Sequence, residues 1–164
     1  MPGVYMSNFP GNVLRPTPPN NNWVISLPVP STSTFPMFDP DSDSGKFVKA
    51  IVLKRDQLLG KRVLASTPYM TGDEILATFK KVFPVAGKNA SYHVLTSEEF
   101  KNNLINYAKM PEFAAQELLE NFQLFEEFGY YGGAKLDDSL AILEDKLTTW
   151  EDFLKKAPAT KDLE

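Results

Sequence analysis

The segment from Phe35 to Phe83 constrains the fold most, because its local signals agree with one another. Asp43 or Ser44 can cap the free backbone N–H groups at the start of a helix. Apolar residues then recur at helical spacing as far as Leu59, and Gly60 follows where a left-handed residue closes a helix. This pattern predicts a first helix that begins near Asp43 and ends at Gly60.

A strand and a second helix are predicted immediately afterwards. Residues 62–67 (RVLAST) are a short β-prone run, and Pro68 opposes its continuation. Thr71 and Glu74 have the spacing of a capping box, and an apolar stripe follows them to Phe83. Helix, strand and helix in about fifty residues indicate an α/β fold, in which helices cover a sheet.

The first 44 residues differ in composition, since nine of the thirteen prolines lie there. Proline removes a hydrogen-bond donor and disrupts helix interiors, so this lead-in is expected to contain loops and strands. Residues 23–29 (WVISLPV) are the best strand candidate, and residues 35–38 are a plausible partner for it. Pro28 and Pro36 favour edge positions for both strands.

The second half of the chain predicts one short strand and several helices. Residues 91–95 (SYHVL) form the strand candidate, and Thr96 to Glu99 form a second capping box. Residues 111–128 predict a helix with more aromatic residues than one buried seam requires. Thr148 to Glu151 has the form of a third capping box. We therefore expect one domain over residues 1–164, with a small mixed sheet and about five helices.

Composition excludes several classes of function. The chain has no cysteine, which rules out disulfides, thiolate nucleophiles and iron–sulfur ligation. Its formal charge of −4, with lysines spread along helices, argues against direct nucleic-acid binding. No apolar run approaches the roughly 18 residues that span a bilayer, so no membrane segment is expected.

An acidic run, Asp39 to Gly45, invites comparison with a calcium loop. An EF-hand needs glycine at the sixth position and a bidentate glutamate at the twelfth. Counted from Asp39, these positions hold Ser44 and Ala50, so the match fails and no metal site is expected. The acidic side chains are better interpreted as charges favoured at a helix N-terminus.

Two further features suggest chemistry only weakly. Tyr131 and Lys135 have the Y-x-x-x-K spacing of short-chain dehydrogenases, but Gly132 and Gly133 between them favour a turn over a helix. His93 is the only histidine, so with no cysteine it cannot build a usual transition-metal site. It is interpreted as a packed or pocket-lining residue. No catalytic constellation and no glycine-rich phosphate loop is visible.

A family resemblance adds to this interpretation. Residues 1–9 (MPGVYMSNF) resemble the segment of NmrA-like proteins that follows the sixth strand of their Rossmann domain. The later order of WVISLPVP, FPMFDPDSDSG, GKRVLAST, TGDEILATFKKV, a phenylalanine-rich helix and LTTWEDFLKK also matches that family. The resemblance implies an α/β fold that is the C-terminal part of an NmrA-like Rossmann protein, with the N-terminal Rossmann half absent.

The resemblance also implies a site. NmrA-like proteins look like atypical short-chain dehydrogenases that bind NADP or NAD, and the matching segment lies by the nicotinamide end of the cofactor. Carried over, this makes Pro2, Gly3, Val4, Tyr5 and Asn8 cofactor-binding residues. The simpler alternative is that Pro2 and Gly3 only start a turn. The family's phosphate loop and first five strands would lie upstream of Met1, so this chain alone is not expected to hold a dinucleotide tightly.

Two functions follow from the family. The first is a redox sensor and transcriptional co-regulator that acts through a transcription factor or another protein partner, in the cytoplasm or nucleus. The alternative is the substrate half of an NADPH-dependent oxidoreductase of the isoflavone-reductase type, with His93 and Tyr131 lining the pocket. Surfaces that meet the Rossmann half, around residues 23–29 and 113–128, are expected to be exposed or to self-associate.

Overall fold

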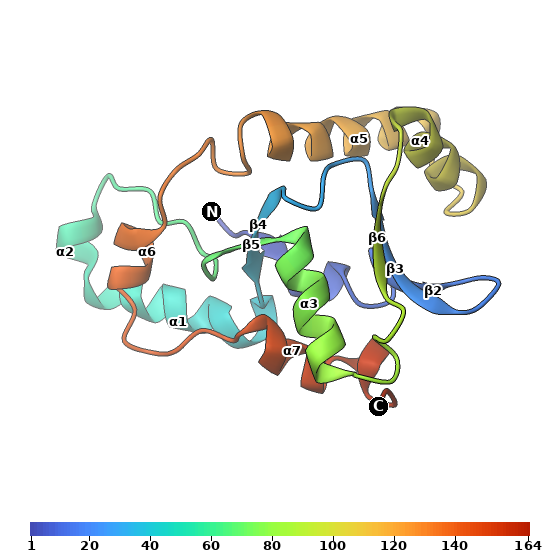
Figure 1. Ribbon diagram of the computed structural model, residues 1–164. Coiled ribbons are helices and arrows are strands. Elements are labelled where there is room, and N and C mark those ends of the chain that lie inside the picture. Colours follow the sequence, from blue (N-terminus) through green and yellow to red (C-terminus); the bar gives the residue numbers. More distant parts are fainter.

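The computed structural model describes all 164 residues as a mixed α/β fold (Figure 1). The strands are β1 Val4–Tyr5, β2 Leu14–Thr17, β3 Asn22–Leu27, β4 Thr34–Phe38, β5 Tyr69–Thr71 and β6 Ser91–Val94. The α-helices are α1 Pro40–Leu53, α2 Arg55–Leu58, α3 Gly72–Val82, α4 Ser97–Asn106, α5 Glu112–Glu127, α6 Asp137–Ala141 and α7 Trp150–Lys156. Two short 3-10 helices cover Met6–Asn8 and Pro158–Thr160. No helix combines the length and the apolar character that crossing a membrane requires.

The predicted α/β class is confirmed, although the strands are divided between two sheets and there are seven α-helices instead of about five. One sheet has the order β1-β4-β5, with β1 parallel and β5 antiparallel to β4. The other has the order β2-β3-β6, with β2 antiparallel and β6 parallel to β3. The long helix α5 runs along one side of the molecule, α7 lies on the opposite side, and α3 crosses the middle and packs against α7 (Figure 1).

The predicted pairing of residues 23–29 with residues 35–38 is wrong, and so is their predicted edge position. The two strands lie in different sheets, and β3 and β4 are each the central strand. Pro28 lies just past the last residue of β3, so it removes no donor from that strand. In β4, only Met37 and Phe38 pair with the short strand β1. Pro36 lies before this paired stretch, so its missing N–H does not interrupt the parallel pairing.

The strand predicted at residues 62–67 is reduced to one isolated bridge between Ala65 and Pro2. Ala65 donates its N–H to the carbonyl of Met1 at 2.9 Å, and Gly3 donates to the carbonyl of Ala65 at 2.9 Å. The N–H of Thr67 donates instead to the carbonyl of Met37 at 2.8 Å. The run is therefore shared between two neighbours, and too few successive residues pair with either one to form a ladder.

Helix starts follow the capping chemistry closely. Capping boxes at Thr71 and Thr96 are present in full, with Glu74 and Glu99 reaching back to the cap residues. The predicted third capping box does not form: Thr149, not Thr148, is the cap of α7, and it accepts from the N–H of Asp152 as a simple side-chain cap.

The first helix departs from its predicted limits at both ends. Helix α1 begins at Pro40, earlier than the predicted Asp43 or Ser44, since proline fits the first helical position, where no N–H is needed. It ends at Leu53, and Lys54 separates it from the single turn of α2. Gly60 then adopts a left-handed φ of 73°, as its closing position predicts.

The main core is a cluster of twenty buried residues that spans both sheets and the helices around them, and a smaller cluster consists of Leu64, Tyr131 and Leu136. Trp23 of β3 packs against Phe79 of α3 with ring centroids 5.0 Å apart. Trp150 of α7 donates its indole N–H to the carbonyl of Ile75 at 3.1 Å. The expectation that residues 23–29 form an exposed surface is wrong, because Ile25 and Val29 are completely buried between the second sheet and these helices.

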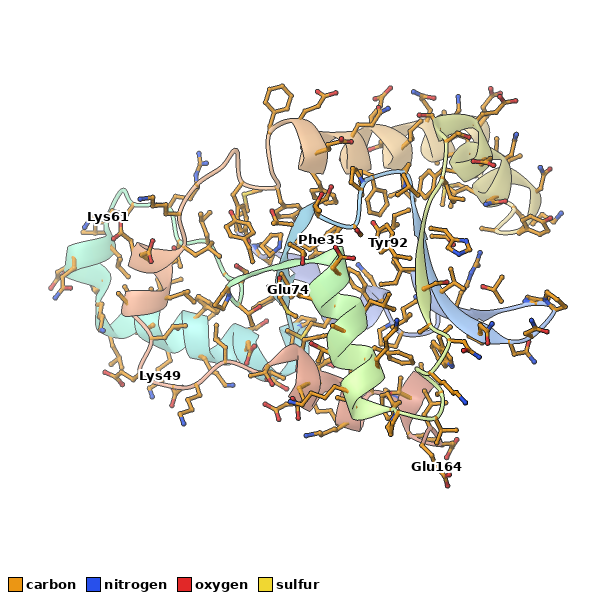
Figure 2. All side chains as sticks on the ribbon, in the orientation of Figure 1. Phe35, Lys49, Lys61, Glu74, Tyr92 and Glu164 are labelled. Carbon is orange, nitrogen blue, oxygen red and sulfur yellow. The ribbon has the colours of Figure 1, made fainter.

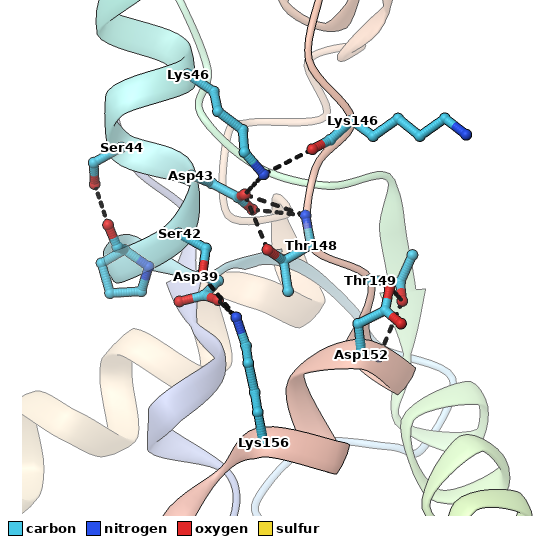
Figure 3. Close-up of polar contacts among 11 residues, drawn as sticks. Asp39, Ser42, Asp43, Ser44, Lys46, Lys146, Thr148, Thr149, Asp152 and Lys156 are labelled. Atoms are coloured by element: carbon cyan, nitrogen blue, oxygen red, sulfur yellow. Dashed lines mark hydrogen bonds and ion pairs between the residues drawn. The ribbon is translucent and has the colours of Figure 1, made fainter.

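Two buried carboxylates join the start of α1 to the segment around α7 (Figure 3). Asp43 is inaccessible to solvent and accepts hydrogen bonds from the N–H and hydroxyl of Thr148 at 3.1 Å and from Lys46 at 2.7 Å. Asp39 accepts from Lys156 at 2.8 Å. The acidic run that resembled a calcium loop is therefore used for packing between elements about a hundred residues apart in the chain.

The Asp39–Lys156 pair predicts a dependence of stability on pH. Burial raises the pKa of Asp39, but the hydrogen bonds and charge of Lys156 together with Ser42 outweigh it and hold this pKa below its usual value. A depressed native pKa contributes stability above the unfolded-state pKa, and that stability is lost as pH falls through the native pKa. Lys156→Met is expected to cost about 1 kcal/mol at pH 7, since Lys156 is half exposed. Urea unfolding at pH 7 and pH 2.5 should show that the difference in unfolding free energy between wild type and Lys156→Met is smaller at pH 2.5. An equal difference at both pH values would contradict this prediction.

Candidate functional site

A groove of about 560 Å³ lies between the N-terminal segment and α5. Residues 1–5 form one wall together with Asn8, Phe9 and Val13, and α5 forms the other. Phe35 of β4, labelled near the centre of the molecule in Figure 2, lies between them. The fifteen lining residues are Met1, Pro2, Gly3, Val4, Tyr5, Asn8, Phe9, Val13, Phe35, Leu118, Asn121, Phe122, Leu124, Phe125 and Tyr130.

Local packing fixes the N-terminal wall. The N-terminal amine of Met1 donates to the carbonyl of Val63 at 2.8 Å, so the chain start is held against residues 63–65. Tyr130 and Tyr131 donate their hydroxyls to the carbonyls of Pro2 and Met1, at 3.3 and 3.1 Å. These bonds place the two tyrosines that follow α5 directly against the first residues of the chain.

Gly3 has a clear steric reason to be glycine. A Cβ atom at this position would lie 2.1 Å from the backbone carbonyl oxygen of Pro36 and 3.0 Å from the Cβ of Ser66. No side chain fits between these groups, so only glycine allows β1 to approach β4 this closely. Gly3 is also one of the residues that line the groove.

Aromatic rings make the floor and the α5 wall of the groove. Phe35 contacts Phe9 and Phe125 edge to face, with centroids 5.9 and 5.5 Å apart. Phe125 also contacts Phe122 at 5.5 Å and Tyr130 at 5.3 Å. Because each ring is held by its neighbours, the wall is a rigid apolar surface.

The groove carries almost no charge. None of its fifteen lining residues has an acidic or basic side chain, and Asn8 and Asn121 supply its only amides. Burial raises the pKa of Tyr130, and Tyr5 nearby adds to the effect, so this phenol stays neutral at physiological pH. Chemically, the groove suits a flat group that stacks on aromatic rings and forms a few hydrogen bonds.

The structure brings all five predicted cofactor-binding residues, Pro2, Gly3, Val4, Tyr5 and Asn8, to this groove. Whether they bind a cofactor stays a prediction. It does not bring the two predicted substrate-lining residues, His93 and Tyr131, into the lining.

His93 lies on β6 with an exposed side chain, and its Nε2 is 3.2 Å from Oγ of Ser91. Tyr131 is buried behind Tyr130, with its hydroxyl bound to the backbone of Met1. The predicted turn at residues 131–135 is confirmed, since Gly132 and Gly133 both have positive φ and the segment forms no helix.

Sequence reasoning missed the α5 wall and Phe35 as parts of the groove. The excess of aromatic residues on α5 was the available signal, but it indicated only that the helix has more than one apolar face. Part of that surface is solvent-exposed, as expected, with Phe113 76% and Phe128 62% exposed. Which aromatic residues line the groove depends on where the N-terminal segment crosses α5, and that is a contact between distant parts of the chain.

Comparison with known proteins agrees with the family resemblance. A model of the NmrA-like family matches residues 1–154. A search of curated proteins found no match.

Among solved structures, the chain is similar to a crystal structure of NmrA, a negative transcriptional regulator, in complex with NADP. The two share 14% identity and a TM-score of 0.66. It is also similar to NmrA in complex with NAD, at 12% identity and a TM-score of 0.69. In both comparisons 99% of this chain is covered but only 51% of the other, so the chain spans about half the length of the structures it matches. At this identity the structural likeness shows the fold, while the family match over residues 1–154 shows membership: the chain belongs to the NmrA-like family.

Proposed function

We propose that this chain forms one wall of a nicotinamide-dinucleotide cleft and that it serves a regulatory role through a protein partner such as a transcription factor. The observation that carries the proposal is the groove, because it gathers the five residues that the family resemblance implies at the nicotinamide end, Pro2, Gly3, Val4, Tyr5 and Asn8. The family match and the regulators among similar structures support the same function.

The chemistry of the groove limits which part of a dinucleotide it can hold. A nicotinamide ring is flat, and the rings of Phe35, Phe125 and Tyr130 offer it an apolar wall. A pyrophosphate needs cationic side chains or a helix N-terminus aimed at it. The lining has no cationic side chain, so we propose that the chain by itself binds the ring end weakly and does not bind the whole dinucleotide tightly.

The alternative function, the substrate half of a reductase, assigned substrate contacts to His93 and Tyr131. His93 lies outside the groove, and the Tyr131 hydroxyl is engaged by the Met1 carbonyl. Neither residue is placed to contact a molecule in the groove. We therefore keep the regulatory function as the proposal.

Titration with nicotinamide mononucleotide and with NADP tests this proposal. In heteronuclear NMR spectra, millimolar mononucleotide is expected to shift the amide signals of residues 2–8 and of α5, while the signal of His93 stays in place. Calorimetry with NADP is expected to give a dissociation constant of about 1 mM or weaker, close to −4 kcal/mol. Micromolar affinity for NADP would contradict the weak-binding part, and shifts confined to residues outside the groove would contradict the site.

Two matched variants on α5 sharpen the test. Leu124 lines the groove and Phe113 does not, yet both are exposed apolar residues on the same helix. Leu124→Lys is expected to abolish the mononucleotide-induced shifts, because it puts a second positive charge beside the cationic nicotinamide ring. Phe113→Lys should leave them unchanged. Equal effects of the two variants would show that binding does not use the groove.

A further inference from the structure

Helix α1 has an exposed apolar face that no part of the chain covers. Its inner face consists of Asp43, Phe47 and Ala50, all buried. The residues on the opposite side recur at intervals of four, three and four, which keeps them on one line of the helix surface. These residues, which we call the α1 seam, are Asp41, Gly45, Val48 and Val52. Val48 is 59% and Val52 62% exposed, and Ile51 beside them is 39% exposed.

Gly45 is the least expected member of the α1 seam. It lies inside a helix, where glycine is less favourable than alanine because it loses more backbone freedom on folding. A Cβ atom at this position would meet nothing within 4 Å, so no contact inside the chain requires its absence. A helix surface without a side chain is useful where a second element packs closely against it. The apolar exposure and the glycine therefore point to the same line of α1.

We propose that two copies of this chain associate through the α1 seam, with their α1 helices antiparallel about a two-fold axis beside Val48. In that arrangement Val48 packs against its own copy, and Val52 packs over Gly45 of the other chain. The packing is self-complementary, because each contact occurs twice by symmetry. A shallow crossing angle of about 20° would keep the whole seam in contact.

Charge selects the antiparallel orientation and the second copy as the occupant. Asp41 lies in the first turn of α1, and Arg55 is the first residue of α2, just past the C-terminal end of α1, so the two ends of the helix carry opposite charges. The two-fold axis therefore brings Asp41 of one chain near Arg55 of the other, twice, while a parallel pair would bring like charges together. Within the chain, Arg55 contacts only its neighbour Asp56, at 3.3 Å, and these side chains are 74% and 89% exposed. Such an exposed pair is weak, so Arg55 is free to bind across the interface.

The lysine beside the seam already has an ion-pair partner within the chain. Lys49, labelled on α1 in Figure 2, binds Asp145 at 2.8 Å within the same chain. Asp41 has no ion pair within the chain and Arg55 has only its exposed contact with Asp56, and these are the two charges that the second copy would use. Helix α1 also lies at one end of the molecule, opposite the β2–β3 hairpin and apart from α5, so the seam is a different surface from the groove (Figure 1).

Sedimentation equilibrium of the purified chain from about 1 to 300 μM tests the proposal. Wild type is expected to show a reversible monomer–dimer equilibrium, and Val48→Asp should shift the sample fully to monomer. Val85 is a matched control, because it is an exposed apolar residue (69%) outside the seam. Val85→Asp should dimerise like wild type. A wild-type chain that stays monomeric at 300 μM would overturn the proposal, and this outcome includes the case in which the seam binds some other protein. A dimer that survives Val48→Asp would also overturn it.

Two further variants exclude simple unfolding as the cause. Asp41→Arg and Arg55→Asp are each expected to weaken dimerisation at least tenfold, and the double variant should restore it, because the exchanged charges still face each other. High salt should reduce the effect of all three. Gly45→Ala should raise the unfolding midpoint measured at 1 μM but weaken dimerisation about tenfold, a combination that damage to the fold cannot produce. Failure of the double variant to recover association would refute the antiparallel arrangement.

Discussion

Asp43→Ala is expected to lower the free energy of unfolding by about 3–5 kcal/mol, because it removes a buried charge with three partners. The side chain is inaccessible to solvent and accepts from the N–H of Thr148, the hydroxyl of Thr148 and the ammonium of Lys46. Without it, the N–H and hydroxyl of Thr148 stay buried and unpaired next to a cavity. Urea unfolding followed by circular dichroism measures the loss.

Two control variants separate the roles of charge and burial. Asp43→Asn keeps one acceptor oxygen for Thr148 but loses the ion pair with Lys46, so we expect a loss of about 1–3 kcal/mol. Glu98 is an exposed acidic residue in the first turn of α4, where it has only the favourable position at the helix N-terminus. Glu98→Ala should cost about 0.5 kcal/mol or less. If Asp43→Ala cost no more than Glu98→Ala, the connection between α1 and the α7 segment would not contribute to stability.

Gly3→Ala is expected to destabilise the chain by about 3 kcal/mol or more, because the added methyl group collides with backbone. The collision is with the carbonyl oxygen of Pro36, at 2.1 Å, and a backbone group cannot rotate away as a side chain does. Relief requires β1 to move off β4, which displaces the N-terminal wall of the groove. We expect a lower unfolding midpoint and, in whatever fraction stays folded, loss of the response to nicotinamide mononucleotide.

Gly45→Ala is the natural comparison, since its methyl group meets nothing within 4 Å. In the monomer it should raise stability by about 0.5–1 kcal/mol, as expected for an alanine that replaces a glycine inside a helix. The two glycine variants are thus expected to have opposite signs at low protein concentration. A Gly3→Ala variant as stable as wild type would show that the close approach of β1 to β4 is not needed for the fold.

Local signals predicted the helices well because helix starts depend on neighbouring residues. The boxes at Thr71 and Thr96 need only a hydroxyl and a glutamate three residues apart, and both formed as predicted. The same rule placed the start of α7 one residue early, because Thr148 and Thr149 are both suitable caps. Thr148 is instead used by Asp43, which lies about a hundred residues away in the chain. No local pattern contains that contact.

Strand pairing was the least predictable part of the fold. Residues 23–29 and 35–38 were correctly recognised as strands, but their β-prone character does not say which neighbours they choose. Their actual partners include β6, more than sixty residues after β3, and β1 at the start of the chain. The central position of β4 despite Pro36 depends on where β1 stops pairing, which is again a contact between distant residues.

The candidate site likewise has one part that the sequence predicted and one part that it did not. The resemblance of residues 1–9 to NmrA-like proteins selected Pro2, Gly3, Val4, Tyr5 and Asn8, and all five lie at the groove. The sequence offered no signal that Phe35 and α5 would form the rest of it, or that His93 would lie elsewhere. A short motif specifies its own backbone, whereas a groove needs two walls that come from different parts of the chain.

By itself, then, the sequence determined the helix caps and one wall of the groove, because these depend on residues close together in the chain, and it determined the α/β class and the family from the order of such local motifs. Only the tertiary structure decided the two-sheet arrangement, the burial of Asp39 and Asp43, the opposite wall and the exposed line along α1. Those features depend on which distant surfaces pack together, and packing is set by the fit of the whole chain, which no local pattern encodes.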